Sequence, residues 1–187
     1  LAAGLDILCE KPIADTMDAT LRIARKVKAA GRRMAVTMSH RFDQDKTSLR
    51  RVVKSGLLGP LNTIGMRFRG DMRQFMAWTS RFRHEMDHPL LVEGTIHHVD
   101  ILCDLAGAPC ETVKAIPWKP GWAEYAGDTD AILVLTFANG VKVVYEGSVS
   151  HPVGLNTFYK EYICVDGEQG TAILNSRDLE VFLRQDI

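Results

Sequence analysis

The chain has 187 residues, and its 23 lysines and arginines balance its 23 aspartates and glutamates. This balance excludes the strong overall positive field that is typical of nucleic-acid-binding proteins, and the length is sufficient to bury a sizeable core. No apolar run approaches the roughly 20 residues that a membrane-spanning helix needs, so we expect neither a nucleic acid nor a membrane as partner.

The first elements form a strand–helix–strand unit. Residues 5–9 are apolar and predict a strand, residues 17–30 have helical spacing with Asp15 and Asp18 as candidate caps, and residues 34–38 predict the next strand. Short links between them imply a parallel pair with a right-handed crossover. In such a unit ligands bind where the strands end, which is at Glu10 and Lys11 and at residues 39–41.

A helix over residues 46–55, a strand over 61–68 and a second helix over 91–106 follow, the last closed by Gly107 and Pro109. The polar, irregular stretch 70–90 is long for a loop in a compact domain, and such loops are usually functional or mobile.

The rest of the chain predicts strands over residues 112–117, 131–137, 141–149, 160–165, 171–174 and 179–183. Asn139-Gly140 is a strong hairpin signal between two of them. We therefore expect an α+β region with an open, mostly antiparallel sheet that carries helices on one face. Residues 131–137 (AILVLTF) are apolar at nearly every position, which indicates cover on both faces. Either a partner subunit or a long loop of the same chain would supply the second cover.

Three side chains are candidates for acid–base chemistry. Lys11 stands at the tip of an apolar strand before Pro12, where its charge is costly unless something pairs with it. His97 follows Glu93 by four residues, so the two share a face if the segment is helical. Lysine, carboxylate and histidine together can move a proton on and off a substrate hydroxyl, and a histidine held by carboxylates is a good general base. The alternatives are local salt bridges at Lys11 and at His97.

The segment His84-Glu85-Met86-Asp87-His88 matches the H-E-x-x-H pattern of zinc proteases. Such a site needs the motif inside a long helix, but Pro89 follows at once and no third ligand stands at the usual spacing. We therefore predict neither a protease nor a metal site.

The four cysteines are scattered, with no C-x-x-C pair, which is typical of reduced thiols and predicts a cytoplasmic protein.

Four segments together resemble the glucose–fructose oxidoreductase and inositol dehydrogenase family (the Gfo/Idh/MocA type). Glu10-Lys11-Pro12 after an apolar strand resembles its E-K-P motif, and residues 39–43 (SHRFD) resemble the opening of its second domain. Residues 55–59 (SGLLG) are similar to its S-G-x-x-G turn, and residues 93–107 (EGTIHHVDILCDLAG) to its catalytic helix with the H-x-x-D pattern. The segments occur in the family's order and span essentially the whole chain.

This resemblance implies an oxidoreductase that uses NAD or NADP on a hydroxyl of a sugar, an inositol or a related polyol. It implies a Rossmann-domain remnant over residues 1–38 and a substrate-binding and oligomerisation domain over 39–187, forming a dimer or tetramer through the open sheet. Catalysis would fall to Lys11, His97 and Glu93, although many relatives carry aspartate at the last position. The remaining implied roles are cofactor binding by Glu10, Lys11 and Pro12, with a cis bond before the proline, and substrate binding by Arg41, Trp78 and Asp100.

The chain lacks a G-x-G-x-x-G loop after a predicted strand, so nothing is expected to hold a pyrophosphate. We expect these 187 residues to be the later part of a larger protein and to bind NAD(P) poorly alone. The alternative is a non-catalytic dimerisation or ligand-binding module derived from the same family.

Overall fold

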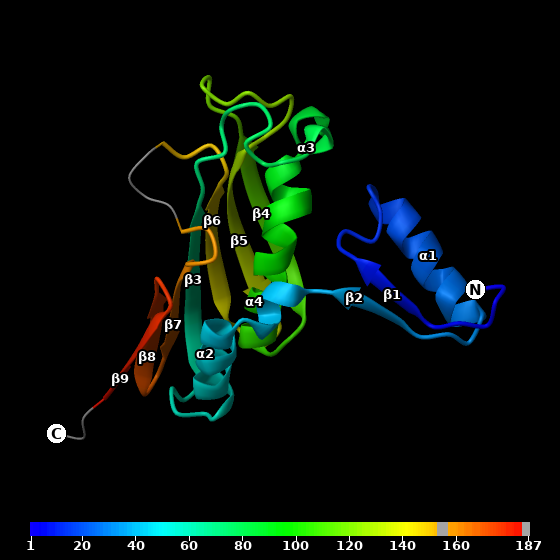
Figure 1. Ribbon diagram of the computed structural model, residues 1–187. Coiled ribbons are helices and arrows are strands. Elements are labelled where there is room, and N and C mark those ends of the chain that lie inside the picture. The colour runs from blue at the N-terminus through cyan, green and yellow to red at the C-terminus, as the bar shows by residue number, and fades with distance from the viewer. Residues whose placement is uncertain (153–156, 185–187) are drawn as a thin grey trace. The chain divides into compact units, whose positions relative to one another are not determined.

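The computed structural model describes residues 1–152 and 157–184, which fall into two compact units, Leu1–Ser39 and His40–Ile187 (Figure 1). In the described part of the chain, no helix has the length and apolar character needed to cross a membrane.

The first unit consists of β1 (Ile7–Glu10), α1 (Met17–Ala29) and β2 (Met34–Thr37). The two strands pair in parallel, from Ile7 opposite Met34 to Glu10 opposite Thr37, as predicted. The predicted cap is wrong in detail, because Thr16 is the N-cap residue and its Oγ1 accepts a hydrogen bond from the Ala19 amide at 3.3 Å. Asp18 lies in the first turn, where the helix dipole stabilises a carboxylate.

The second unit is built on a seven-stranded sheet with the order β4-β5-β6-β3-β7-β8-β9. Its strands are β3 (Leu61–Arg69), β4 (Cys110–Trp118), β5 (Asp130–Phe137), β6 (Lys142–Ser148), β7 (Tyr162–Gly167), β8 (Gly170–Asn175) and β9 (Asp178–Leu183). All neighbours are antiparallel except β3 and β6, which pair in parallel. The sequence-based expectation of a mostly antiparallel sheet is therefore confirmed. The hairpin between β5 and β6 turns at Gly140, which has φ of +90°.

The helices of this unit are η1 (Ser39–Phe42), α2 (Gln44–Lys54), α3 (Arg81–Glu85), the π-helical turn η2 (Leu90–Gly94) and α4 (Thr95–Ala106). The predicted helix 91–106 is thus two elements, with a π-helical turn ahead of α4. Gly107 ends α4 in the left-handed region, at φ of +68°, a conformation that glycine adopts without steric cost.

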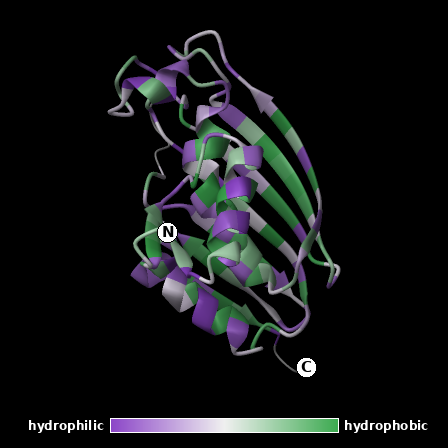
Figure 2. Ribbon diagram, turned by 90° about the vertical axis from the view of Figure 1, so that its right-hand side faces the viewer, coloured by the Kyte–Doolittle hydropathy of each residue, from purple (hydrophilic) through white to green (hydrophobic). Residues whose placement is uncertain are grey.

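The core lies between the sheet and the helices α2 and α4, as Figure 2 illustrates by the apolar residues along the strands. On α4, His98, Ile101, Leu102 and Leu105 follow the spacing i, i+3, i+4, i+7 and are all buried. Cross-strand partners on the same side of the sheet, among them Leu133 and Tyr145, are buried against this face. The predicted cover by helices on one face is confirmed.

The opposite face of the sheet is open. Ile132, Val134 and Val144 on β5 and β6 are 38%, 42% and 46% exposed, and Ile116 on the edge strand β4 is 66% exposed. Strand β5 therefore alternates between buried and exposed residues even though nearly all of them are apolar. No loop in the described part of the chain buries this face, so the expectation of a partner subunit there stays a prediction.

Candidate functional site

His97 projects from the first turn of α4 and lies half-buried. Its ring stacks on that of His40 in η1, with the ring centroids 4.4 Å apart and the planes inclined by 25°. On its other side His40 stacks on Tyr159, at 4.9 Å and 23°. The three rings come from helix α4, from η1 and from the segment before β7, so distant parts of the sequence meet at His40.

His98, the next residue, points into the core instead. Its Nδ1 lies 2.9 Å from the hydroxyl of Tyr145, which is also 3.1 Å from Thr95 Oγ1, and its Nε2 lies 3.7 Å from Glu161 Oε1. Glu161 Oε2 in turn lies 2.6 Å from the ammonium group of Lys46. Neighbouring helix residues diverge by about 100°, so the two histidine side chains point in different directions.

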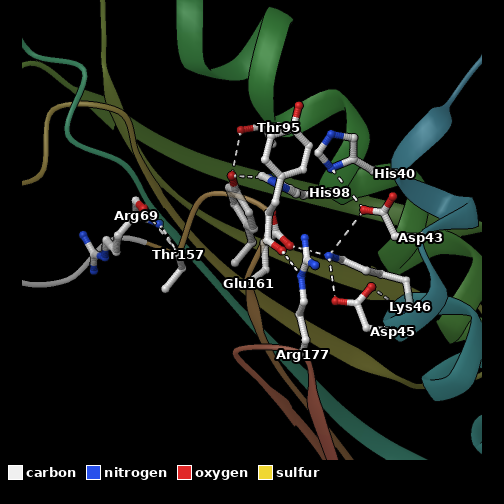
Figure 3. A network of polar contacts seen from close by, with 12 residues as sticks. His40, Asp43, Asp45, Lys46, Arg69, Thr95, His98, Thr157, Glu161 and Arg177 are labelled. Carbon is white, nitrogen blue, oxygen red and sulfur yellow. Dashed lines mark hydrogen bonds and ion pairs between the residues drawn. The ribbon is translucent and has the colours of Figure 1, made fainter. Parts of the chain in front are cut away.

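This buried polar network, defined as Lys46, Glu161, His98, Tyr145 and Thr95, lies between α2, α4 and the sheet (Figure 3). Each of its side chains is at most 3% exposed. Lys46 also contacts the carboxylates of Asp45 at 3.2 Å and Asp43 at 3.6 Å, which extend the network to the surface. The network therefore ties the helix that carries His97 to α2 and to the start of β7.

Charge–charge contacts determine the ionisation of the network. Burial alone would raise the pKa of Glu161, but the neighbouring His98 and Lys46 outweigh it and lower the pKa to about 2. Burial likewise disfavours the charged form of Lys46, but Glu161 and Asp45 outweigh it and raise its pKa. Glu161 is therefore an anion and Lys46 a cation at neutral pH. Burial lowers the pKa of His40, which favours its neutral form.

A second cluster lies before α4. Glu93 is 5% exposed and accepts a hydrogen bond from Arg83 Nε at 2.9 Å. Arg83 also donates to the carbonyl oxygen of Trp78 at 3.1 Å and lies over the Trp78 ring at 5.3 Å. The predicted loop 70–90 thus supplies a cation to the candidate carboxylate, and Trp78 packs against that cation.

Arg41 and Asp100 were predicted separately as substrate contacts, and the structure brings them together. Arg41 Nε donates to Asp100 Oδ2 at 2.7 Å in a two-pronged ion pair that joins η1 to α4. Hydrogen bonding to Asp100 raises the pKa of Arg41. A contact of either side chain with substrate stays a prediction.

Glu10, Lys11 and Pro12 lie in the first unit, at the carboxyl end of β1. The peptide bond between Lys11 and Pro12 is cis, as predicted. The carboxyl end of parallel strands is where ligands bind in open α/β sheets. The N-terminus of α1, which follows this strand, is capped by its own Thr16 and carries Asp18, whose negative charge disfavours a pyrophosphate there.

The H-E-x-x-H segment has no metal-site geometry. Helix α3 ends at Glu85 and Met86 is extended, so His84 and His88 do not lie on one helix. His84 Nε2 accepts from the Met76 amide at 3.1 Å, and its Nδ1 lies 3.1 Å from the Glu124 carbonyl oxygen, so His84 joins two loops. Among residues 1–152 and 157–184, no three His, Cys, Asp or Glu side chains are grouped as metal ligands.

Sequence reasoning included His40 only as part of the strand end at residues 39–41, and it missed Tyr159 and the buried charges. The spacing of Lys46 with Leu49 and Val53 places it on the apolar face of α2, and Glu161 alternates with Ile163 and Val165. These two periodicities are signals that were available. Nothing in the sequence indicates that His40 stacks on His97, because the contact depends on the approach of η1 to α4.

Comparison with known proteins shows the relationship of the chain. Residues 47–173 match the model of the GFO/IDH/MocA C-terminal domain. The chain is 58% identical over 184 residues to the protein y4oX of Sinorhizobium fredii, covering 98% of this chain and 51% of that protein. It is 31% identical over 156 residues to inositol 2-dehydrogenase of Corynebacterium glutamicum, covering 82% of this chain and 44% of that enzyme. The chain thus spans about half the length of these relatives.

Solved structures share the fold. An oxidoreductase from Agrobacterium radiobacter, in complex with NAD+, L-tartaric acid and magnesium, superposes with a TM-score of 0.89 at 23% identity, over 97% of this chain and 52% of that one. An inositol dehydrogenase homolog from Azotobacter vinelandii, complexed with NADH and myo-inositol, gives 0.76 at 16% identity, over 98% and 51%. The family match and the sequence identities lead to one conclusion: the chain belongs to the GFO/IDH/MocA family of oxidoreductases.

Proposed function

We propose that the chain is the substrate-side part of an NAD(P)-dependent dehydrogenase that oxidises a hydroxyl of an inositol, a sugar or a related polyol in the cytoplasm. The observation that carries the proposal is a histidine on α4, His97, held against His40 in a chain that belongs to this family. The relationship to inositol 2-dehydrogenase, over 82% of the chain, supports the class of substrate.

In this proposal His97 is the general base that removes the proton of the substrate hydroxyl. Lys11 hydrogen-bonds that hydroxyl and stabilises negative charge on its oxygen, and Glu93 orients the base or the substrate. The contact of Glu93 with Arg83 gives the carboxylate a defined direction. Arg41, Trp78 and Asp100 are proposed as pocket residues.

When bound, a nicotinamide dinucleotide, NAD or NADP, would supply the hydride acceptor. The end of β1 fits the proposed role of Glu10, Lys11 and Pro12, since ligands bind at such strand ends. The capped and acidic N-terminus of α1 does not fit a pyrophosphate. We therefore assign no residue of this chain to the phosphates, and propose that residues 1–38 are the remnant of a Rossmann domain whose phosphate loop belongs to a longer protein.

We also propose that residues 39–187 form a homo-oligomer, a dimer or tetramer, through the open face of the sheet. Ile132, Val134 and Val144 make that face apolar, and no described part of the chain covers them. An exposed apolar patch of this kind typically marks a protein interface.

The alternative function is a non-catalytic dimerisation or ligand-binding module. The same open sheet face favours it, and so does the lack of a phosphate site at α1. The two candidates differ in whether the His97 side chain is needed for turnover.

The first experiment titrates NADH and NADPH into the 187-residue chain and follows nicotinamide fluorescence. The second fuses the unmatched part of the Sinorhizobium fredii relative ahead of Leu1 and screens NAD- and NADP-dependent oxidation of inositols, sugars and polyols. We expect weak or no binding by the chain alone and turnover by the fusion.

In the fusion, Lys11→Ala and His97→Ala should each lower turnover by about a hundredfold or more, the scale of a lost acid–base group. Asp128→Asn serves as a control, because this aspartate pairs with the exposed His88 and has no proposed role in the reaction. Turnover close to that of the unaltered fusion in His97→Ala would refute the role of the base and favour the binding module.

A further inference from the structure

His40 occupies the middle of a stack of three rings, with His97 on one face and Tyr159 on the other. Both pairs are close to parallel, and the His40 side chain is only 15% exposed. A ring enclosed on both faces presents only its edge to other groups. His40 is therefore placed to contact His97 through its π-face and not through its nitrogens.

The edge of the middle ring faces a carboxylate. His40 Nδ1 lies 4.0 Å from Asp43 Oδ2, which is too far for a hydrogen bond, and the same Asp43 oxygen is 3.6 Å from Lys46 Nζ. Lys46 in turn pairs with the buried Glu161. Asp43 therefore lies between His40 and the buried polar network (Figure 3), and the position of His40 depends on its two ring faces.

The buried polar network fixes the helix that carries His97. His98, adjacent to His97, lies between Tyr145 and Glu161. Glu161 therefore holds α4 at the residue that follows His97.

The outer ring is also held in an unusual way. Tyr159 has φ of +58°, in the left-handed region that a bulky side chain rarely adopts. Such a conformation persists only when the surrounding structure determines it, and it is found preferentially at functional sites. This backbone turn brings the Tyr159 ring flat against His40.

We propose that His40 is a positioning residue for His97. Its flat ring, stacked between His97 and Tyr159, restricts rotation of the His97 imidazole. The stack thereby sets the direction of the His97 nitrogens. The inference rests on the proposed function of His97 as the general base. A base must present its nitrogen to the substrate hydroxyl within hydrogen-bond reach, and small misplacements of such groups lower turnover strongly.

The variants His40→Phe and His40→Leu separate a flat ring from other properties of the residue. His40→Phe keeps the stacking surface and removes both nitrogens, whereas His40→Leu fills a similar volume without a flat face. If the flat ring face positions His97, the orientation of the His97 ring is kept in His40→Phe and lost in His40→Leu. His88→Ala is the control, since its ring contacts Asp128 outside the stack.

The first readout needs no turnover. In carbon-edited NMR spectra of the 187-residue chain, the ring protons of His97 are assigned by their loss in His97→Asn. A parallel ring at 4.4 Å shifts them upfield. We expect this upfield shift to persist in His40→Phe and His88→Ala and to disappear in His40→Leu. His97 resonances that stay in place in a folded His40→Leu variant would overturn the inference.

The second readout is turnover of the fusion described above. We expect kcat of His40→Leu to fall by about tenfold to a hundredfold with KM changed by less than about threefold, since a misdirected base affects the transition state more than binding. His40→Phe should keep at least about a third of the original kcat. Equal losses in both variants would mean that a nitrogen of His40 is required, which refutes positioning by the ring face.

The NMR readout and the turnover readout together separate this inference from the proposed function. Full turnover in His97→Asn would refute the proposed function, whatever the NMR spectra show. If His40→Leu does not fold, Tyr159→Leu tests the stack from its exposed end, and a His97 signal that moves downfield supports the inference. No change of that signal would contradict it.

Discussion

Replacing Glu161 by glutamine tests whether the buried polar network stabilises the second unit. Glu161 is 1% exposed and lies 2.6 Å from Lys46. Removing one partner of a buried ion pair typically costs about 3–5 kcal/mol. Because Lys46 retains Asp45 at 3.2 Å, we expect the lower end, about 3 kcal/mol.

The pKa of Glu161 gives an independent magnitude. Lowering it from 4.5 to about 2 in the folded state corresponds to about 3 kcal/mol of stability. Since the folded pKa is the lower one, this contribution is complete above about pH 4.5 and is lost as the pH falls through about 2. The difference between the original chain and Glu161→Gln should therefore shrink to about 1 kcal/mol at pH 3.

Urea denaturation followed by tryptophan fluorescence measures this effect, because Trp78, Trp118 and Trp122 all belong to the second unit. At pH 7 the stability lost in Glu161→Gln should lower the melting temperature by about 6–12 °C for a chain of this size. Glu146→Gln is the matched control, since this glutamate is 31% exposed in its ion pairs with Arg67 and Arg69 and should cost about 1 kcal/mol or less.

Two results would refute the reasoning on Glu161. The first is a loss below about 1 kcal/mol at pH 7, which would mean that the desolvation of the charges cancels their attraction. The second is a loss of the same size at pH 7 and pH 3, which would show that the ionised carboxylate is not the source of the stability.

Three further substitutions test the steric fit at Gly147, the backbone strain at Gly107 and the proposed interface at Val134. A Cβ at Gly147 would lie 2.5 Å from the buried Tyr145 hydroxyl oxygen, so Gly147→Ala should lower the free energy of unfolding in urea by about 1–3 kcal/mol. In the control Gly65→Ala the added Cβ has no atom within 4 Å, and stability should change by less than about 0.5 kcal/mol. Equal losses would contradict this steric argument. Gly107→Ala, at φ of +68° with no atom within 4 Å, should cost about 1–2 kcal/mol from backbone strain alone, and Gly107→Asn should cost less in thermal melts. An asparagine variant as unstable as the alanine variant would argue against strain. Val134→Lys, on the open sheet face, should leave urea stability within about 0.5 kcal/mol but shift sedimentation to the monomer, and an unchanged oligomer would count against that interface.

Much of the fold was predictable from the sequence because local patterns and burial agree. The apolar runs within residues 131–149 and the Asn139-Gly140 turn predicted the β5–β6 hairpin, and the spacing over 91–106 predicted the helix that carries His97. The parallel pairing of β3 and β6 could not be predicted, because these strands are far apart in the sequence and their direction depends on how the chain returns.

The candidate site was predictable only in part. Residue types and their order pointed to His97, Glu93 and Lys11, but the pairing of Glu93 with Arg83 depends on the path of the irregular loop before it. Likewise, Arg41 and Asp100 are 59 residues apart, and only the approach of η1 to α4 makes them an ion pair.

The sequence by itself determined the elements, the apolar face of each and the family relationship, since these depend on local spacing and residue order. The tertiary structure alone decided which side chains surround His97. Stacking of His40 and the burial of Lys46 against Glu161 need atoms from separate elements within a few ångströms, and only the packing of α2 and α4 on the sheet brings them together.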